Sequence, residues 1–125
     1  MKIASTIARL LLGLVFTVFG LNGFLHFIPN MAMPDQAVAL FTAFAGSGYM
    51  IALIFCTQTI GGIFLLTGMY VPLGLAILAP VVVNIFMFHL YLAPGGLGIA
   101  SVVAALELFL VWSNRAAFAP MLRAK

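Results

Sequence analysis

The chain has 125 residues, of which 66% are hydrophobic and only 6% are charged, and its mean hydropathy is +1.30. A soluble domain carries about 25% charged residues, so this composition excludes a water-soluble protein and predicts an integral membrane protein. The net charge of +3 comes from a few cations that form no patch, so it does not indicate a partner that is a nucleic acid.

Four apolar runs predict an all-α membrane protein, folded as a single four-transmembrane-helix bundle of about 20 residues per span. No alternating strand pattern occurs in the sequence, so helices rather than a barrel satisfy the backbone in lipid. Pro72 suits the first turn of the third span. The predicted spans are residues 3–28, 49–69, 71–92 and 97–118.

A short helix is predicted between the first two spans, at about residues 34–45. Pro34 and Asp35 favour a helix start, Gly46 favours a stop, and apolar residues recur between them at helical spacing. This helix is expected to lie at the membrane interface or to fold back over the bundle. A plain loop remains the alternative.

All cationic residues lie toward the two chain ends and none lies in the three connections. Positively charged residues stay on the cytoplasmic side, so an even number of spans predicts that both termini are cytoplasmic. The first apolar run is too long for the core of a signal peptide, which favours a retained span in a bacterial cytoplasmic (inner) membrane. The cations are Lys2, Arg9, Arg115, Arg123 and Lys125.

Small residues at helical spacing on three spans predict close contact between helix backbones. The single cysteine, Cys56, cannot form an intrachain disulfide, which excludes a membrane oxidoreductase that needs a C-x-x-C pair. The small-residue stripes are Gly13 with Thr17 and Gly20, Thr57 with Gly61, Gln58 with Gly62, Ala100 with Ala104, and Ser101 with Ala105.

Each span carries one strongly polar side chain, and the predicted boundaries bring all four between the membrane midplane and its outer quarter. Polar side chains are costly in lipid and mark functional positions, so we expect a ligand-binding pocket in the outer half of the bundle. Two histidines lie above this layer. The pocket candidates are Asn22, His26, Gln58, Asn84 and Glu107, with His89 as a weaker candidate for cofactor binding.

Glu107 is the only acid within a predicted span. Arg115 lies eight residues further on, about 12 Å along a helix, which is too far for a direct ion pair. We expect Glu107 to be protonated or hydrogen-bonded to Gln58, Asn84 or a histidine. A proton-handling or ligand-anchoring acid and a structural interhelical hydrogen bond both remain open.

The spacing of the histidines from the asparagines predicts how these side chains point. Asn22 and His26 are four residues apart and share one helix face. Asn84 and His89 are five residues apart, about 140° around the helix, so both cannot point into one pocket. If Asn84 faces inward, His89 is turned aside.

The side chains of the predicted pocket are compatible with more than one kind of ligand. A quinone held by His26 or Gln58 among phenylalanine side chains is favoured over a haem between His26 and His89. No metal site is predicted, because Glu107 lies too deep to join the histidines. Purely structural hydrogen bonds are the remaining alternative.

The segments "ARLLLGLVFTVFGLNGFLHF", "QTIGGIFLLTGMYVPLGLAIL" and "VNIFMFHLYLAPGGLGIA" resemble the DoxX family of small four-helix bacterial membrane proteins over nearly the whole chain. The marks of the resemblance are Arg9, Gly20, the pair Gly61-Gly62 with Gly68, and the run from Asn84 to His89. Many relatives have glutamate where this chain has Gln58, so a role that needs a charge there is not implied.

The resemblance implies a membrane accessory subunit of a redox or stress-response complex, with a possible link to quinone. It also implies other membrane or membrane-associated redox proteins as partners. The chain is expected not to be an enzyme by itself, and self-association is compatible with the sequence. The alternative is a small protein or enzyme that binds a hydrophobic ligand in an outward-facing polar pocket.

Overall fold

The computed structural model describes residues 2–25 and 34–122, and within them every long element is a helix. Four helices are long and apolar enough to cross a membrane, which confirms the predicted all-α architecture. The described ends of the spans lie close to their predicted boundaries, except that the fourth ends at Ser113 rather than at residue 118. The predicted end of the first span, at residue 28, lies outside the described residues. The span helices are α1 (Lys2–Leu25), α3 (Met50–Thr67), α4 (Val71–Tyr91) and α5 (Leu97–Ser113).

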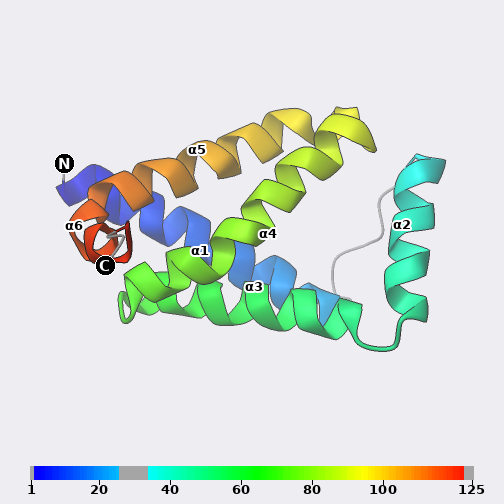
Figure 1. Cartoon of the computed structure of the whole chain (residues 1–125), viewed down its shortest axis with the longest axis horizontal. Coiled ribbons are helices and arrows are strands. Elements are labelled where there is room, and N and C mark those ends of the chain that lie inside the picture. Colours follow the sequence, from blue (N-terminus) through cyan, green and yellow to red (C-terminus); the bar gives the residue numbers. More distant parts are fainter. Residues whose placement is uncertain (1, 26–33, 123–125) are drawn as a thin grey trace.

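The four spans form a closed ring in which each helix packs against two others. Helix α1 packs against α3 and α5, and α4 packs against the same two helices from the other side. Figure 1 shows α4 crossing the bundle diagonally, from the end of α3 to the beginning of α5. Both termini lie at one end of the bundle, as an even number of antiparallel spans requires.

The predicted short helix is present as α2 (Asp35–Gly46), which confirms its start and its stop. It lies across the end of the bundle opposite the termini (Figure 1). Its Ala37 is fully buried, and the Phe41 ring packs edge-on against Phe88 of α4, with centroids 5.5 Å apart. This transverse position at the far end is the one expected of an interfacial helix.

Turn chemistry explains where the helices stop. Ser47 Oγ accepts a hydrogen bond from the Met50 backbone N–H, which joins the end of α2 to the start of α3. Gly68 has φ of 75°, so α3 ends in a left-handed residue that suits glycine. A short 3-10 turn at Pro94–Gly96 connects α4 to α5. Past α5, the chain continues as α6 (Arg115–Phe118) and a second 3-10 turn.

Arg9 stabilises the α3 end from a neighbouring helix. Its Nη1 donates to the Leu65 carbonyl at 2.6 Å and lies 3.5 Å from the Leu66 carbonyl. These carbonyls belong to the last turn of α3, where a cation is favoured by the helix dipole and by unsatisfied oxygens. Arg9 therefore links α1 to the turn between α3 and α4.

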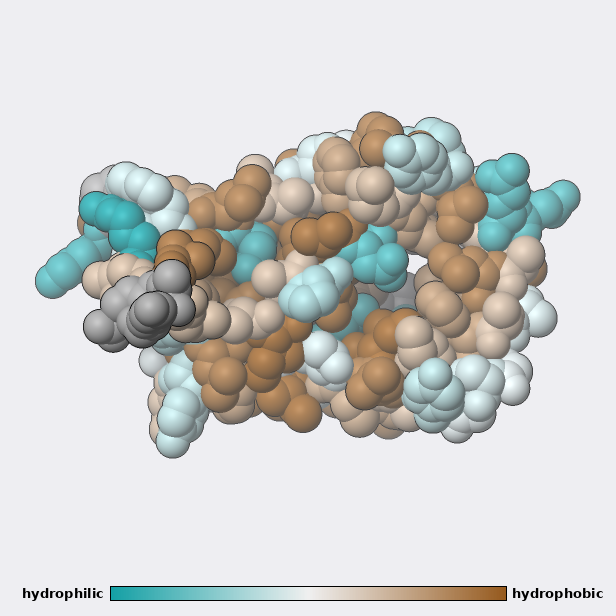
Figure 2. Space-filling model, viewed as in Figure 1, coloured by the Kyte–Doolittle hydropathy of each residue, from teal (hydrophilic) through white to brown (hydrophobic). Residues whose placement is uncertain are grey.

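The hydrophobic core is concentrated in the half of the bundle that contains the termini. Its members come from the first part of α1 and α4 and from the later part of α3 and α5. Around this core, large apolar side chains are exposed along every span, and Figure 2 shows them over most of the middle of the face in view. The core side chains are Ala8, Leu12, Phe16, Leu65, Leu75, Leu78, Val82, Val103 and Leu110.

Candidate functional site

Glu107 is buried in the hydrophobic core, with only 4% of its surface exposed. Val103 and Leu110 lie four residues before it and three after it on α5, and both belong to the core. Both carboxyl oxygens of Glu107 are buried and have no hydrogen-bond partner among residues 2–25 and 34–122. An unsatisfied buried carboxyl is costly, so this position is the strongest candidate site in the described part of the chain.

Gln58 is the second buried polar side chain, with 8% of its surface exposed. It lies on the inward face of α3 with Gly61, Gly62 and Leu65, which are all buried. The sequence therefore predicted the inward orientation of Gln58 and of Glu107 correctly. Both side chains come from helices that lie diagonally across the ring rather than side by side.

The level of Gln58 follows from the contact between α1 and α3. A Cβ added at Gly20 would lie 2.8 Å from the Thr59 backbone nitrogen, so these two residues face each other. Gln58 is next to Thr59, and Asn22 is two residues beyond Gly20. Asn22 and Gln58 thus share a level on adjacent helices, as predicted.

Glu107 lies ten residues, about 15 Å, from the beginning of α5 at Leu97. Gln58 lies eight residues, about 12 Å, from the beginning of α3 at Met50, and Asn84 lies seven residues, about 10 Å, from the end of α4 at Tyr91. The outer end of the first span lies outside the described residues, so the common layer of four polar side chains stays a prediction.

Asn22 is half-buried near the end of α1 and takes part in an interaction there. His26, the predicted companion of Asn22, lies outside the described residues. The predicted pocket that combines Asn22, His26 and Glu107 therefore stays a prediction.

On α4, the orientations of the two polar side chains are the reverse of those expected. Asn84 is exposed, whereas His89 is half-buried and its Nδ1 lies 3.1 Å from the Ala93 carbonyl oxygen. The His89 ring occupies the space beside Gly96 and packs edge-on against Phe88. His89 therefore braces the connection between α4 and α5, and the inward position predicted for Asn84 is wrong.

Asn84 and His89 point in different directions, as their separation of about 140° predicts. His89, rather than Asn84, is the side chain that is turned toward the bundle. Val82 is buried in the core, and Asn84 follows it by two residues, about 200° around the helix. Asn84 consequently shares the outer face of α4 with exposed residues on the turns before and after it. That face also carries Leu73, Pro80, Met87 and Tyr91.

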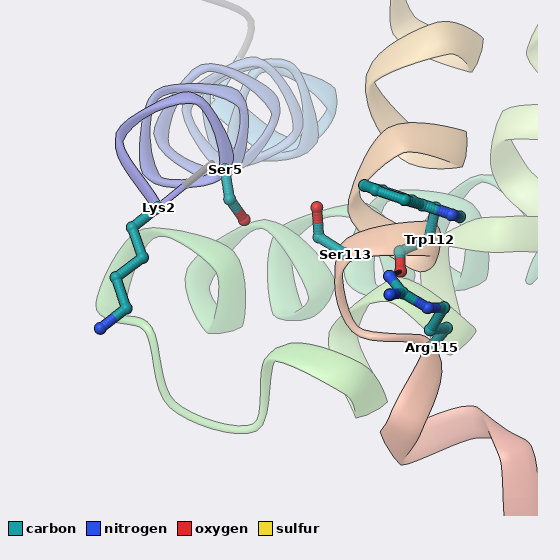
Figure 3. A pocket seen from close by; sticks show the side chains of 5 residues that line it. All are labelled: Lys2, Ser5, Trp112, Ser113 and Arg115. Atoms are coloured by element: carbon teal, nitrogen blue, oxygen red, sulfur yellow. Dashed lines mark hydrogen bonds between the residues drawn. The ribbon is translucent and has the colours of Figure 1, made fainter.

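A depression of about 330 Å³ opens at the terminal end of the bundle, between α1 and the end of α5. Figure 3 shows the hydroxyl groups of Ser5 and Ser113 pointing toward each other, with Arg115 beneath the Trp112 ring. The sequence did not predict a site at this end of the bundle. The signal that could have indicated one is the concentration of cations near both chain ends. The lining residues are Lys2, Ser5, Trp112, Ser113 and Arg115.

Within residues 2–25 and 34–122, no three His, Cys, Asp or Glu side chains lie close enough together to hold a metal ion. Glu107 can donate or accept a proton, or bind a hydrogen-bonding group of a hydrophobic molecule. No protein-family model, curated protein or solved structure matches this chain. The evidence on function therefore comes from the burial, contacts and chemistry of the described residues.

Proposed function

We propose that this multi-pass membrane protein is an accessory subunit that binds another membrane protein through the outer face of α4. The observation that carries this proposal is the orientation of Asn84. Asn84 is exposed on a face of α4 that points away from the core, seven residues or about 10 Å from the helix end at Tyr91. This depth lies within the hydrocarbon region.

An amide that faces lipid at this depth has no hydrogen-bond partner in the solvent around it. Polar side chains of transmembrane helices usually face the protein interior, where they hydrogen-bond to a neighbouring helix. Asn84 faces away from the core of its own bundle, on an otherwise apolar stripe. A helix of a partner protein that carries a hydrogen-bonding side chain would satisfy this amide.

The wider assignment follows from the resemblance to the DoxX family. The resemblance makes the partner a component of a redox or stress-response complex in the bacterial cytoplasmic membrane. The position of the cationic residues toward both chain ends separately favours cytoplasmic termini. The architecture supports an accessory role, because most of the described chain lies in four candidate spans that expose apolar side chains.

Photo-crosslinking from position 84 tests this proposal directly. A photoreactive amino acid at position 84 should give a discrete adduct with another membrane protein in native membranes. The same group at Val102, exposed in the same half of α5, should give none and is the matched control. Asn84→Leu should lower co-purification of that partner about threefold, given the average strength of such hydrogen bonds.

Two results would contradict the accessory role. Adducts that are the same from positions 84 and 102 would show no preferred partner on α4. An adduct with only a second copy of the chain would replace the accessory role with self-association.

A second function, binding of a hydrophobic ligand such as a quinone, is favoured by one observation. The Glu107 carboxyl has no partner among the described residues although it is buried in the core. A carbonyl or hydroxyl group of a lipid-soluble molecule would supply the missing hydrogen-bond partner of this carboxyl.

Extraction of the purified protein with organic solvent measures any bound quinone per chain. The ligand-binding function predicts a near-stoichiometric amount that falls with Glu107→Leu and persists with Leu108→Ala, a change on the exposed side of the same helix turn. If no quinone is extracted and a stable partner protein is found, the result would exclude quinone binding and support the accessory role.

A further inference from the structure

The terminal end of the bundle carries positive charge that no acid of the chain balances. The whole chain has two acids, Asp35 and Glu107. Asp35 begins α2 at the opposite end, and Glu107 is buried within the core. Among the cations of the described chain, Arg9 already donates to carbonyls of α3. Lys2 and Arg115 remain exposed on the two sides of one depression.

Arg115 is held in a defined position at this depression. Its Cζ lies 4.5 Å from the centroid of the Trp112 ring, and its Nη1 donates to the Trp112 carbonyl at 2.9 Å. A guanidinium has five N–H donors, so this arrangement leaves others for an anion. The stacking on the ring fixes the plane of the fork, which favours bidentate contact with phosphate oxygens.

Two hydroxyl groups lie between the cations. Ser5 of α1 and Ser113 of α5 point toward each other in Figure 3, whereas Lys2 reaches outward on the α1 side. Ser113 Oγ is buried and has no hydrogen-bond partner among the described residues. The depression thus joins two cations and an unsatisfied donor, without an acid in its lining.

We infer that this depression binds the phosphate of an anionic phospholipid headgroup in the leaflet that faces the termini. Arg115 and Lys2 supply the charge, and the serine hydroxyls donate to phosphate oxygens. Trp112 lies at the end of its span, where indole rings favour the headgroup region. Basic pockets between helices at the cytoplasmic surface are suited to such headgroups.

Trp112 is the only tryptophan of the chain, so its fluorescence reports on this site alone. The full-length protein is placed in phosphatidylcholine bilayers that contain either brominated phosphatidylglycerol or brominated phosphatidylcholine at equal mole fraction. Bromine quenches the indole at short range. The preference for phosphatidylglycerol, measured as a ratio of quenching constants, should be about fivefold or more.

Variants separate a built site from general attraction between charges. Lys2→Gln and Arg115→Gln should each lower the ratio up to about fivefold. The double variant Ser5→Ala with Ser113→Ala keeps every charge and should still lower it at least about twofold. The ratio is taken within each variant, so a changed environment of Trp112 affects both lipids equally. Circular dichroism confirms that each variant is folded.

Three outcomes would overturn the inference. The first is an equal ratio for both lipids in the unmodified protein. The second is a serine double variant with an unchanged ratio, which would mean attraction by surface charge without a built site. The third is displacement of phosphatidylglycerol by inorganic phosphate, which would identify a site for the free ion instead.

Discussion

The contact between α1 and α3 differs from the surroundings of α5, although both lie in the same ring of helices. Between α1 and α3, glycine lets the backbones touch: a Cβ at Gly62 would lie 2.6 Å from the Thr17 backbone nitrogen and 3.0 Å from the Gly13 carbonyl. On α5, by contrast, Gly98 faces open space. The core position on α5 that lies between Val103 and Leu110 holds an acid without a hydrogen-bond partner among residues 2–25 and 34–122.

This difference shows which sequence patterns identify a helix–helix contact in a membrane protein. A glycine at a close backbone contact cannot be replaced, so a stripe of small residues identifies the contact directly. An apolar residue, however, suits both lipid and core. A hydrophobic helix in lipid therefore does not reveal which of its faces points inward.

The largest expected effect tests the contact between α1 and α3. Gly62→Leu should lower the free energy of unfolding by at least about 3 kcal/mol, because the new side chain meets backbone atoms that cannot move aside. Unfolding is measured by circular dichroism in detergent micelles titrated with a denaturing detergent. Gly98→Leu, at a position with no neighbour within 4 Å, is the control and should be nearly neutral.

An intermediate effect is expected at the end of the same contact. Arg9→Met removes the hydrogen bond to the Leu65 carbonyl and should lower the free energy of unfolding by about 2 kcal/mol. Lys2→Met removes an exposed charge from the same helix and should change it little. Equal losses from the two variants, in the same unfolding assay, would show that Arg9 acts only through its charge.

The smallest effect is expected on α5, and its sign is opposite. Glu107→Leu should raise the free energy of unfolding by about 1 kcal/mol, because it replaces a buried, unsatisfied carboxyl with an apolar side chain. Glu107→Gln keeps an unsatisfied polar group and should bring no such gain. Loss of stability in Glu107→Leu would instead mean that the carboxyl has a structural partner, and the contrast with the α1–α3 contact would disappear.

The sequence predicted most of the fold. Span number, the short helix α2 and its limits, and the turn residues were all readable from local chemistry. The paired stripes on α3 were also informative, because Gly62 faces α1 whereas Gly61 packs against Leu78 of α4. On α5 the sequence contains two stripes of small residues and does not indicate which one faces the bundle. In the structure Ala100 is buried, whereas Ser101 is exposed.

The candidate site was less predictable than the fold. Burial of Gln58 and Glu107 agreed with the expectation that polar residues face inward. The same expectation was wrong for Asn84, because His89 and Val82 turned the other side of α4 toward the bundle. The predicted common layer of Asn22, Gln58, Asn84 and Glu107 stays a prediction, although Glu107 lies ten residues into α5, as expected.

Sequence by itself determined that this protein lies in a membrane, that it crosses four times, and that its stripes of small residues allow close contact between helix backbones. These properties follow from composition and from backbone sterics, which act locally. Only the tertiary structure decided that α1 packs against α3 and how α4 and α5 are rotated about their axes. Each residue turns a helix by about 100°, so the packing partners, rather than a uniformly apolar sequence, select which polar side chains meet the core.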